Sequence, residues 1–280
     1  MTLVKIWFGD QAAEAVSPLD RGLAYGDGVF ETIRLINRQP VLMDYHWARL
    51  SAGCAQLGLR DLPFWRQAFA TFLAELPTDK HNGVVRLQVT RGVSQRGYLP
   101  DPDALPTLIL SWHGAAEHPS QWSSDGIEIT QLNTPLAQQP RLAGIKHLSR
   151  LEQVLLRQDL AALPHCQEGL VCDVEGFVVE GVFSNVFAVI NGQLCTPSLG
   201  NCGVRGVLRD ALLDELMQQN LPVNIRNIAA TEMAKADEIF FCNSVYGIWP
   251  VARWGDKTWQ VGSLTRQCQS IVSSWFAIHG

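Results

Sequence analysis

Apolar residues recur along this chain at two spacings, and each spacing predicts one kind of element. Apolar runs bounded by turn residues predict strands in the first half of the chain, at 3–8, 29–36, 84–90 and 107–112. Apolar residues three and four apart predict helices at 45–59 and 64–76. The first of these helices has a core stripe formed by Trp47, Leu50, Cys54 and Leu57.

The second half of the chain predicts more strands than helices. Helices are expected from about Arg150, over 206–219 and from about Leu264, and Glu175-Gly176 and Asn191-Gly192 predict hairpin turns. Strands are expected at 127–132, 169–173, 177–180, 185–190, 193–196, 222–226 and 238–242. Because strands and helices mix without regular β–α–β alternation, we predict an α+β fold.

Two domains are predicted from these patterns. Residues 114–126 show no periodicity and are interpreted as the connection. A smaller N-terminal domain would then cover 1–113, and a larger C-terminal domain, 127–280, would carry Lys146.

Composition narrows the classes of function. The 280 residues carry a net charge of -5, which argues against nucleic acid or an anionic membrane as the main partner. No apolar run is long enough to span a bilayer, and the N-terminus lacks the apolar core of a signal peptide. The seven cysteines are scattered without a Cys-x-x-Cys pair, and the histidines form no metal-ligand spacing. We therefore expect a cytoplasmic protein with reduced thiols and no metal.

Lys146 stands just before a predicted helix. Ser149 and Glu152 have the spacing of a capping box, and the buried face of the helix is expected to comprise Leu151, Val154, Leu155 and Ala162. A lysine at the positive end of a helix gains nothing from the helix dipole, which makes it a candidate reactive amine. The alternative, a solvated loop lysine, is the ordinary interpretation of a single lysine.

Three further features fit a cofactor that carries a phosphate and a ring nitrogen. Glu180 ends an apolar strand, where a carboxylate needs a partner, and a pyridine nitrogen would be one. Cys202–Arg209 is a glycine-containing turn that runs into a helix, so the amide groups at Gly206 and Val207 could bind a phosphate. Small polar residues after a buried strand, Asn243 and Ser244, and the cation of Arg49 could complete that site. Each feature has a plain structural alternative, but together with Lys146 they indicate pyridoxal 5'-phosphate.

The same residues resemble a known family. Glu180-x4-Asn185-Val186-Phe187, Leu194-Cys195-Thr196 and Val204–Arg209 are similar to the signature of the class-IV aminotransferases, with Val182 as one departure. Asp20–Thr32, His46-x2-Arg49 and Ala236–Ser244 extend the resemblance over nearly the whole chain. The resemblance implies a pyridoxal-phosphate enzyme of fold type IV, like D-amino-acid aminotransferase, that acts as a homodimer.

The resemblance leaves the reaction open between two branches of the family. Gly144–Gln153 is most similar to the lyases that release p-aminobenzoate and pyruvate from 4-amino-4-deoxychorismate for folate synthesis. Thr32 and Leu151 also favour this branch, since branched-chain transaminases have glycine and tyrosine there. The loop Thr90–Tyr98 instead resembles D-amino-acid aminotransferases; Arg96 matches their arginine, but Tyr98 replaces their histidine.

These observations predict which residues act on the substrate. Lys146 and Thr32 are the expected catalytic residues, and the residues expected to bind the substrate are Phe30, Thr32, Arg96 and Tyr98. The first alternative is a D-amino-acid or branched-chain transaminase with the same cofactor residues. The second is a catalytically idle relative that only binds the cofactor or a partner chain.

Overall fold

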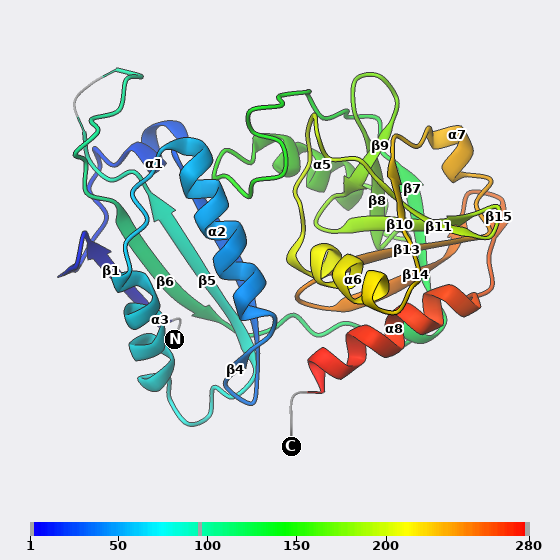
Figure 1. The fold of residues 1–280 in the computed structure, drawn as a ribbon, viewed down its shortest axis with the longest axis horizontal. Helices are drawn as coiled ribbons and strands as arrows, with labels where there is room; N and C mark the ends of the chain where they lie inside the picture. The colour runs from blue at the N-terminus through cyan, green and yellow to red at the C-terminus, as the bar shows by residue number, and fades with distance from the viewer. Residues whose placement is uncertain (1–2, 95–96, 278–280) are drawn as a thin grey trace. The chain divides into compact units, whose positions relative to one another are not determined.

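The computed structural model describes residues 3–94 and 97–277, which form two compact units (Figure 1). The first unit contains the described residues up to Ala116 together with Ile145–Arg150, and the second contains Glu117–Gly144 and Leu151–Ala277. The chain returns to the first unit for the segment that carries Lys146, whereas we expected this lysine in the C-terminal domain. The domain boundaries given above stay a prediction.

The first unit is built on an antiparallel sheet with the strand order β2-β1-β6-β5-β3-β4. Its strands are β1 (Val4–Phe8), β2 (Gln11–Ala13), β3 (Gly28–Ile36), β4 (Gln39–Pro40), β5 (Gly83–Thr90) and β6 (Thr107–His113). Its helices are α1 (Arg21–Tyr25), α2 (Met43–Leu57) and α3 (Phe64–Ala74). The longer elements lie where the apolar spacing predicted them, while the short β2, α1 and β4 were not predicted.

Successive side chains of β3 point to opposite faces of this sheet. Val29, Ile33 and Leu35 are buried in one core with residues of α2 and α3, which cover this face in Figure 1. Side chains alternate along a strand, so Phe30, Thr32 and Arg34 belong to the other face. The β3 strand therefore has a helix-covered face and a face that carries polar groups.

The second unit is built on a nine-stranded sheet with the order β12-β11-β10-β13-β14-β7-β8-β9, to which β15 is added beside β14. Its strands are β7 (Ile127–Gln131), β8 (Glu168–Cys172), β9 (Val178–Gly181), β10 (Asn185–Ile190), β11 (Gln193–Pro197), β12 (Asn224–Arg226), β13 (Glu238–Asn243), β14 (Gly247–Trp254) and β15 (Lys257–Thr258). Its helices are α4 (Gln121–Ser124), α5 (Leu151–Ala161), α6 (Val207–Gln218), α7 (Ala230–Met233) and α8 (Ser263–Phe276). Strands and helices are mixed in both units, which confirms the α+β class.

The β14 strand is the main element that the sequence pattern did not predict. It lies inside the sheet, between β13 and β7, and contains Pro250. Proline lacks the N–H that a central strand donates, so its presence argues against a strand. The register of β14 against β7 shifts between Val251 and Arg253, and such irregularities accommodate a residue that breaks the ladder.

The predicted buried face of α5 is wrong. Leu151 is 75% exposed, and Val154 and Leu155 are also exposed, whereas Leu156 and Leu160 are buried with Leu132 and Val171. The Glu152 carboxylate accepts a hydrogen bond from the backbone N–H of Ala137 at 2.8 Å. The apolar residues at the start of α5 thus predicted the helix correctly but predicted the wrong buried face.

All seven cysteines are buried free thiols. Among the residues that the structure describes, no helix is both long enough and apolar enough to cross a bilayer.

Candidate active site

Lys146 lies in a short extended segment that pairs with the edge of β3. The N–H of Phe30 donates to the Lys146 carbonyl at 2.9 Å, and the N–H of Leu148 donates to the Gly28 carbonyl at 2.9 Å. A Cβ on Gly28 would lie 2.3 Å from the carbonyl oxygen of Val89, so only glycine fits this crowded position. The Lys146 Nζ lies 4.5 Å from the centroid of the Phe30 ring. Backbone bonds to β3 therefore set the position of the candidate reactive amine.

Two arginines that we did not predict share the sheet face of Phe30. Arg86 lies directly opposite Thr32 in the β3–β5 register, and its guanidinium carbon is 4.5 Å from the Phe30 centroid. Arg34 follows Thr32 by two residues on β3. Burial lowers the pKa of both guanidinium groups, and within the described chain their Nε atoms are buried without a hydrogen-bond partner.

We call Arg34, Arg86 and Lys146 the cationic face. Half-buried cations beside a threonine and an aromatic ring suit an anionic, planar ligand. The alternation Phe30-x-Thr32-x-Arg34 in a predicted strand was the sequence signal that could have revealed it.

Arg49 is held by a buried carboxylate that was also not predicted. The Arg49 Nε donates to Glu31 Oε1 at 2.8 Å, and a second guanidinium nitrogen donates to Glu31 Oε2. The His46 Nδ1 lies 2.6 Å from Glu31 Oε2. Burial raises the pKa of Glu31, but Arg49 and His46 outweigh it and bring that pKa to about 2. Arg49 is therefore oriented by an ion pair, and its predicted role toward a phosphate stays a prediction.

His46 completes this group as a neutral side chain. Burial lowers the pKa of His46, and its bond to Glu31 only partly opposes the effect. A neutral His46 donates its Nδ1–H to Glu31 and leaves Nε2 buried without a hydrogen-bond partner in the described part of the chain. The imidazole thus holds one oxygen of the carboxylate that orients Arg49.

In the second unit, a hydrogen bond links Glu180 to the predicted glycine-containing turn. Glu180 lies near the end of β9, is buried, and accepts a hydrogen bond from the backbone N–H of Val204 at 2.8 Å. Gly203 has φ +83°, and a Cβ there would lie 2.6 Å from Val179. The turn before α6 therefore packs directly on the strand that carries the candidate partner of a ring nitrogen.

The start of α6 is fixed by Asn185. The Asn185 Nδ2 donates to the Val204 carbonyl at 2.8 Å, and its Oδ1 accepts from the N–H of Gly206 at 3.0 Å. A Cβ on Gly206 would lie 2.1 Å from that Oδ1, so glycine is required for this approach. Gly206 caps α6 without a side-chain acceptor, and the helix begins at Val207. Amide groups at such a helix start are suited to bind an anion.

Asn243 is the last residue of β13, and Ser244 begins the turn that follows this strand. Cys242 pairs with Asn185 in the β10–β13 register, which brings the turn next to the start of α6. The Asn243 Oδ1 accepts from the N–H groups of Val245 and Tyr246, at 2.9 and 3.0 Å. Asn243 thus holds the shape of its own turn, while Ser244 is buried in it. Their proposed contact with a phosphate is untested.

A second buried glutamate supports the residues after Glu180. Glu168 accepts hydrogen bonds from the N–H of Val182 at 2.9 Å and from the Ser184 hydroxyl. Burial raises the pKa of Glu168 to about 7, although these hydrogen bonds oppose the rise. Glu168 was not predicted, because it directly precedes a predicted strand, 169–173, and belongs to no motif.

The loop predicted to bind substrate is only partly described. Arg96 lies outside the described residues. Tyr98 is 87% exposed and its ring lies 5.5 Å from that of Tyr25, while Arg21 donates to the carbonyl of Tyr98 at 2.9 Å. Arg91, at the start of the same loop, is buried and pairs with Asp27 at 2.7 Å. Arg91 is therefore a structural cation.

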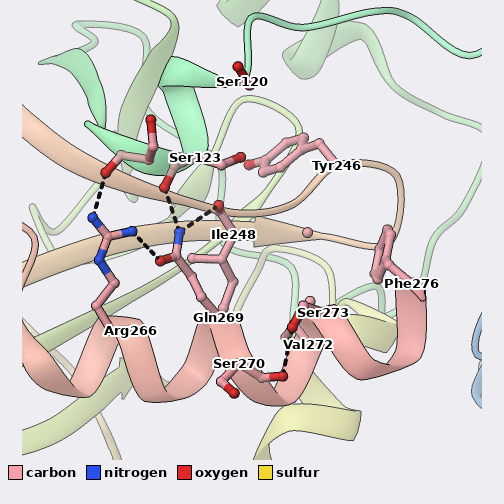
Figure 2. Close-up of a pocket in the computed structure, with 12 residues that line it drawn as sticks. Ser120, Ser123, Tyr246, Ile248, Arg266, Gln269, Ser270, Val272, Ser273 and Phe276 are labelled. Atoms are coloured by element: carbon pink, nitrogen blue, oxygen red, sulfur yellow. Dashed lines mark hydrogen bonds between the residues drawn. The ribbon is translucent and has the colours of Figure 1, made fainter.

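A hollow of about 540 Å³ lies elsewhere in the second unit, between α4, β14 and α8 (Figure 2). Figure 2 shows Arg266 and Gln269 on its wall, donating to the carbonyls of Ser124 and Ser123 at 2.5 and 2.7 Å. No predicted site residue is among the described residues that line it. The candidate chemistry therefore does not lie in this hollow.

Comparison with known proteins establishes the family. The model of "Amino-transferase class IV" matches residues 28–254, so this chain belongs to the class-IV aminotransferase family, as the motifs predicted. An aminodeoxychorismate lyase from Vibrio harveyi is 30% identical over 259 residues, which cover 91% of this chain and 94% of the relative. A putative branched-chain-amino-acid aminotransferase from Methanocaldococcus jannaschii is also 30% identical, over 93% of this chain and 91% of its own length. The crystal structure of 4-amino-4-deoxychorismate lyase from Pseudomonas aeruginosa has a TM-score of 0.89 and 42% identity, covering 96% of this chain and 98% of that one.

Proposed function

We propose that this chain is a pyridoxal-phosphate-dependent lyase that converts 4-amino-4-deoxychorismate to p-aminobenzoate and pyruvate. Two relatives named as this lyase, at 30% and 42% identity over more than nine tenths of the chain, support the proposal. The observation that carries it is the arrangement on β3. The Lys146 amine lies over Phe30, and Thr32 follows Phe30 by two residues on the same strand face.

The described residues fit pyridoxal phosphate as cofactor. Lys146 would hold its aldehyde, and the buried carboxylate of Glu180 would hold its ring nitrogen in the protonated form. At the start of α6, Gly206 provides no side-chain cap, and we assign the amide groups at Gly206 and Val207 to a phosphate dianion, although the Gly206 N–H also donates to Asn185 Oδ1. We assign Arg49, Asn243 and Ser244 to the same phosphate. When bound, the cofactor supplies an electron sink for the pair released at the amine-bearing carbon of the substrate.

Lys146 and Thr32 are the residues that we assign to proton transfer. The Lys146 Nζ removes the proton from the amine-bearing carbon, as a general base whose position is set by the backbone bonds to β3. The carbon–oxygen bond to the enolpyruvyl group then breaks, its electron pair leaves with the oxygen, and the substrate ring becomes aromatic. The Thr32 hydroxyl or the Lys146 ammonium gives a proton to the departing group, which becomes pyruvate.

We propose that the cationic face holds the two carboxylates of the substrate. Arg86 and Lys146 both lie against the Phe30 ring. Arg34 lies on the same strand face, two residues after Thr32. Two carboxylates need two cationic partners, and arginine binds a carboxylate with two parallel hydrogen bonds. We therefore assign the substrate carboxylates to Arg34 and Arg86, in addition to the predicted Phe30, Arg96 and Tyr98.

The deciding experiment incubates the purified protein with 4-amino-4-deoxychorismate and follows p-aminobenzoate fluorescence and pyruvate together. The proposal expects both products in equal amounts without any added keto acid. Amine transfer from D-alanine or a branched-chain amino acid to 2-oxoglutarate, without p-aminobenzoate, would instead make the chain a transaminase.

Replacing Lys146 by alanine tests the role of the amine. We expect Lys146→Ala to lose turnover and the visible absorption that the lysine-linked cofactor gives. Lys235→Ala is the control, because this lysine follows α7 in the second unit and has no assigned role. An active Lys146→Ala protein would overturn the mechanism.

We further propose that the chain acts as a homodimer in the cytoplasm. A group of exposed apolar side chains on the first unit, formed by Leu19, Leu23, Tyr25, Tyr98 and Leu99, supports an interface there. The seven free thiols support a reducing compartment. Sedimentation of the purified protein tests the dimer, and Leu23→Glu is expected to produce monomers. A wild-type monomer at micromolar concentration contradicts this part of the proposal.

A further inference from the structure

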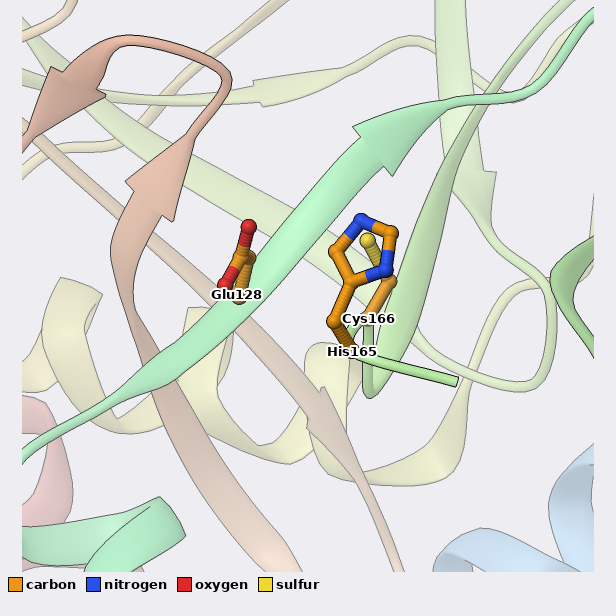
Figure 3. Close-up of side chains that lie close together, drawn as sticks. All are labelled: Glu128, His165 and Cys166. Carbon is orange, nitrogen blue, oxygen red and sulfur yellow. The ribbon is translucent and has the colours of Figure 1, made fainter. Parts of the chain in front are cut away.

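Three residues with side chains of metal-binding type meet in the second unit, and the proposed function uses none of them. Glu128 lies on β7, and His165 and Cys166 form the turn that leads into β8. One ligand atom from each residue lies within 4.8 Å of the others. Figure 3 shows the three side chains close together, with Glu128 on β7 and His165 and Cys166 beside that strand. We call these three residues the Glu128 cluster.

The ligand types in the Glu128 cluster select the kind of ion. A thiolate, an imidazole and a carboxylate are the ligands of zinc, whereas calcium and magnesium are bound by oxygen atoms. Zinc–ligand bonds of about 2.0–2.3 Å place two ligand atoms of a tetrahedral site roughly 3.3–3.7 Å apart. Binding requires the ligand atoms, which now lie within 4.8 Å of one another, to close to these values; the His165 side chain is exposed and that of Glu128 is half-buried.

Gln167 holds the backbone of two of the three ligand residues, Glu128 and His165. Its N–H donates to the Glu128 carbonyl at 2.9 Å, and its Oε1 accepts from the N–H of Glu128 at 2.9 Å. Its Nε2 donates to the carbonyl of His165 at 2.8 Å. The N–H of Cys166 donates to the Leu163 carbonyl at 2.9 Å, which closes the turn. The site is therefore organised before any ion arrives, which lowers the cost of binding.

The geometry points to a zinc site formed by Glu128, His165 and Cys166, with water in the fourth position. The bound ion would join β7 to the turn before β8. The first residue of β8, Glu168, supports Val182 and Ser184 by hydrogen bonds, so the ion would stabilise the strand beneath the turn that follows Glu180. No ligand spacing in the sequence predicted this site, because Glu128 lies far from the other two ligands along the chain.

The test measures zinc binding to the metal-free, cofactor-loaded protein by calorimetry. We expect one zinc ion per chain, at least ~100-fold weaker binding in His165→Gln and in Cys166→Ser, and ~10-fold weaker binding in Gln167→Ala, since loss of supporting residues costs metal sites about 10–100-fold. The control is His81→Gln, which removes another exposed histidine and should bind zinc like the wild type.

His165→Gln carries the test if Cys166→Ser misfolds, because His165 is exposed. X-ray absorption at the zinc edge should show one sulfur ligand at about 2.3 Å. A stoichiometry well below one, a zinc environment without sulfur, or equal affinity in wild type and His165→Gln would each overturn the proposal.

Discussion

The carboxylate of Glu31 is the buried anion that holds Arg49, and replacing it by glutamine tests this ion pair. The Glu31 side chain is 2% exposed and that of Arg49 12%. The pKa of Glu31 falls from 4.5 to about 2, because Arg49 and His46 outweigh burial. One pKa unit corresponds to about 1.36 kcal/mol, so the ionised carboxylate is favoured in the fold by roughly 3 kcal/mol. Removing one partner of a buried pair typically costs about 3–5 kcal/mol. We expect Glu31→Gln to lower the free energy of unfolding by about 3 kcal/mol at pH 7.

The pH dependence of this loss gives the sharper test. The folded pKa of Glu31 lies below the unfolded value, so its stabilisation is present above pH 4.5 and is lost as the pH falls towards 2. Denaturant unfolding, followed by circular dichroism at pH 7 and at pH 3, should show the difference between wild type and Glu31→Gln shrinking with acid. The control is Glu75→Gln in the same unit, whose half-exposed ion pair with Lys5 should contribute less than ~1 kcal/mol. A cost of Glu31→Gln within ~1 kcal/mol of the control, or one that is equal at both pH values, would refute the reasoning.

Three other substitutions test the second unit. Gly206→Ala would place a Cβ 2.1 Å from Asn185 Oδ1, so we expect weaker binding of pyridoxal phosphate in a fluorescence titration; unchanged affinity would contradict the role of this turn. The pKa of Glu168 is raised from 4.5 to about 7, so the free energy of unfolding of the wild type should fall by about 3 kcal/mol as the pH rises from 4.5 through 7. Glu168→Gln should remove this pH dependence, which thermal unfolding in metal-free buffer measures. Leu156→Ala on α5 should cost about 2–5 kcal/mol, whereas Leu155→Ala, its exposed neighbour, should cost less than ~1 kcal/mol; equal costs in denaturant unfolding would mean that the buried face is misassigned.

Local apolar spacing was enough to predict most long elements of this fold. The strands β3, β5 and β10 and the helices α2 and α6 carry regular patterns, so their positions followed from the sequence within a few residues. The pattern failed at β14, where Pro250 interrupts it, and at α5, where two leucines are next to each other. Leu155 and Leu156 are both apolar, and only packing against Leu132 and Val171 decides which one is buried.

Sequence motifs indicated the residues that we assign to the cofactor, among them Gly206 and Glu180, but not the residues that support them. Glu31, Arg86 and Glu168 acquire their positions only through strand register and helix packing, which bring together residues far apart in the chain. The cationic face was therefore not predicted, although the alternation of side chains along β3 could have indicated Arg34.

The return of the chain to the first unit at Ile145–Arg150 has a consequence for synthesis on the ribosome. The edge of β3 at Gly28 and Phe30 stays open until Lys146 and Leu148 have been made, well after the rest of that sheet. At ~5–20 residues per second, the intervening stretch keeps this edge unpaired for on the order of seconds. An open strand edge is a site for wrong pairing. A fragment that ends at Ala116 would keep that edge permanently open, so dividing this chain into two sequential halves would separate Lys146 from the strand edge that positions it.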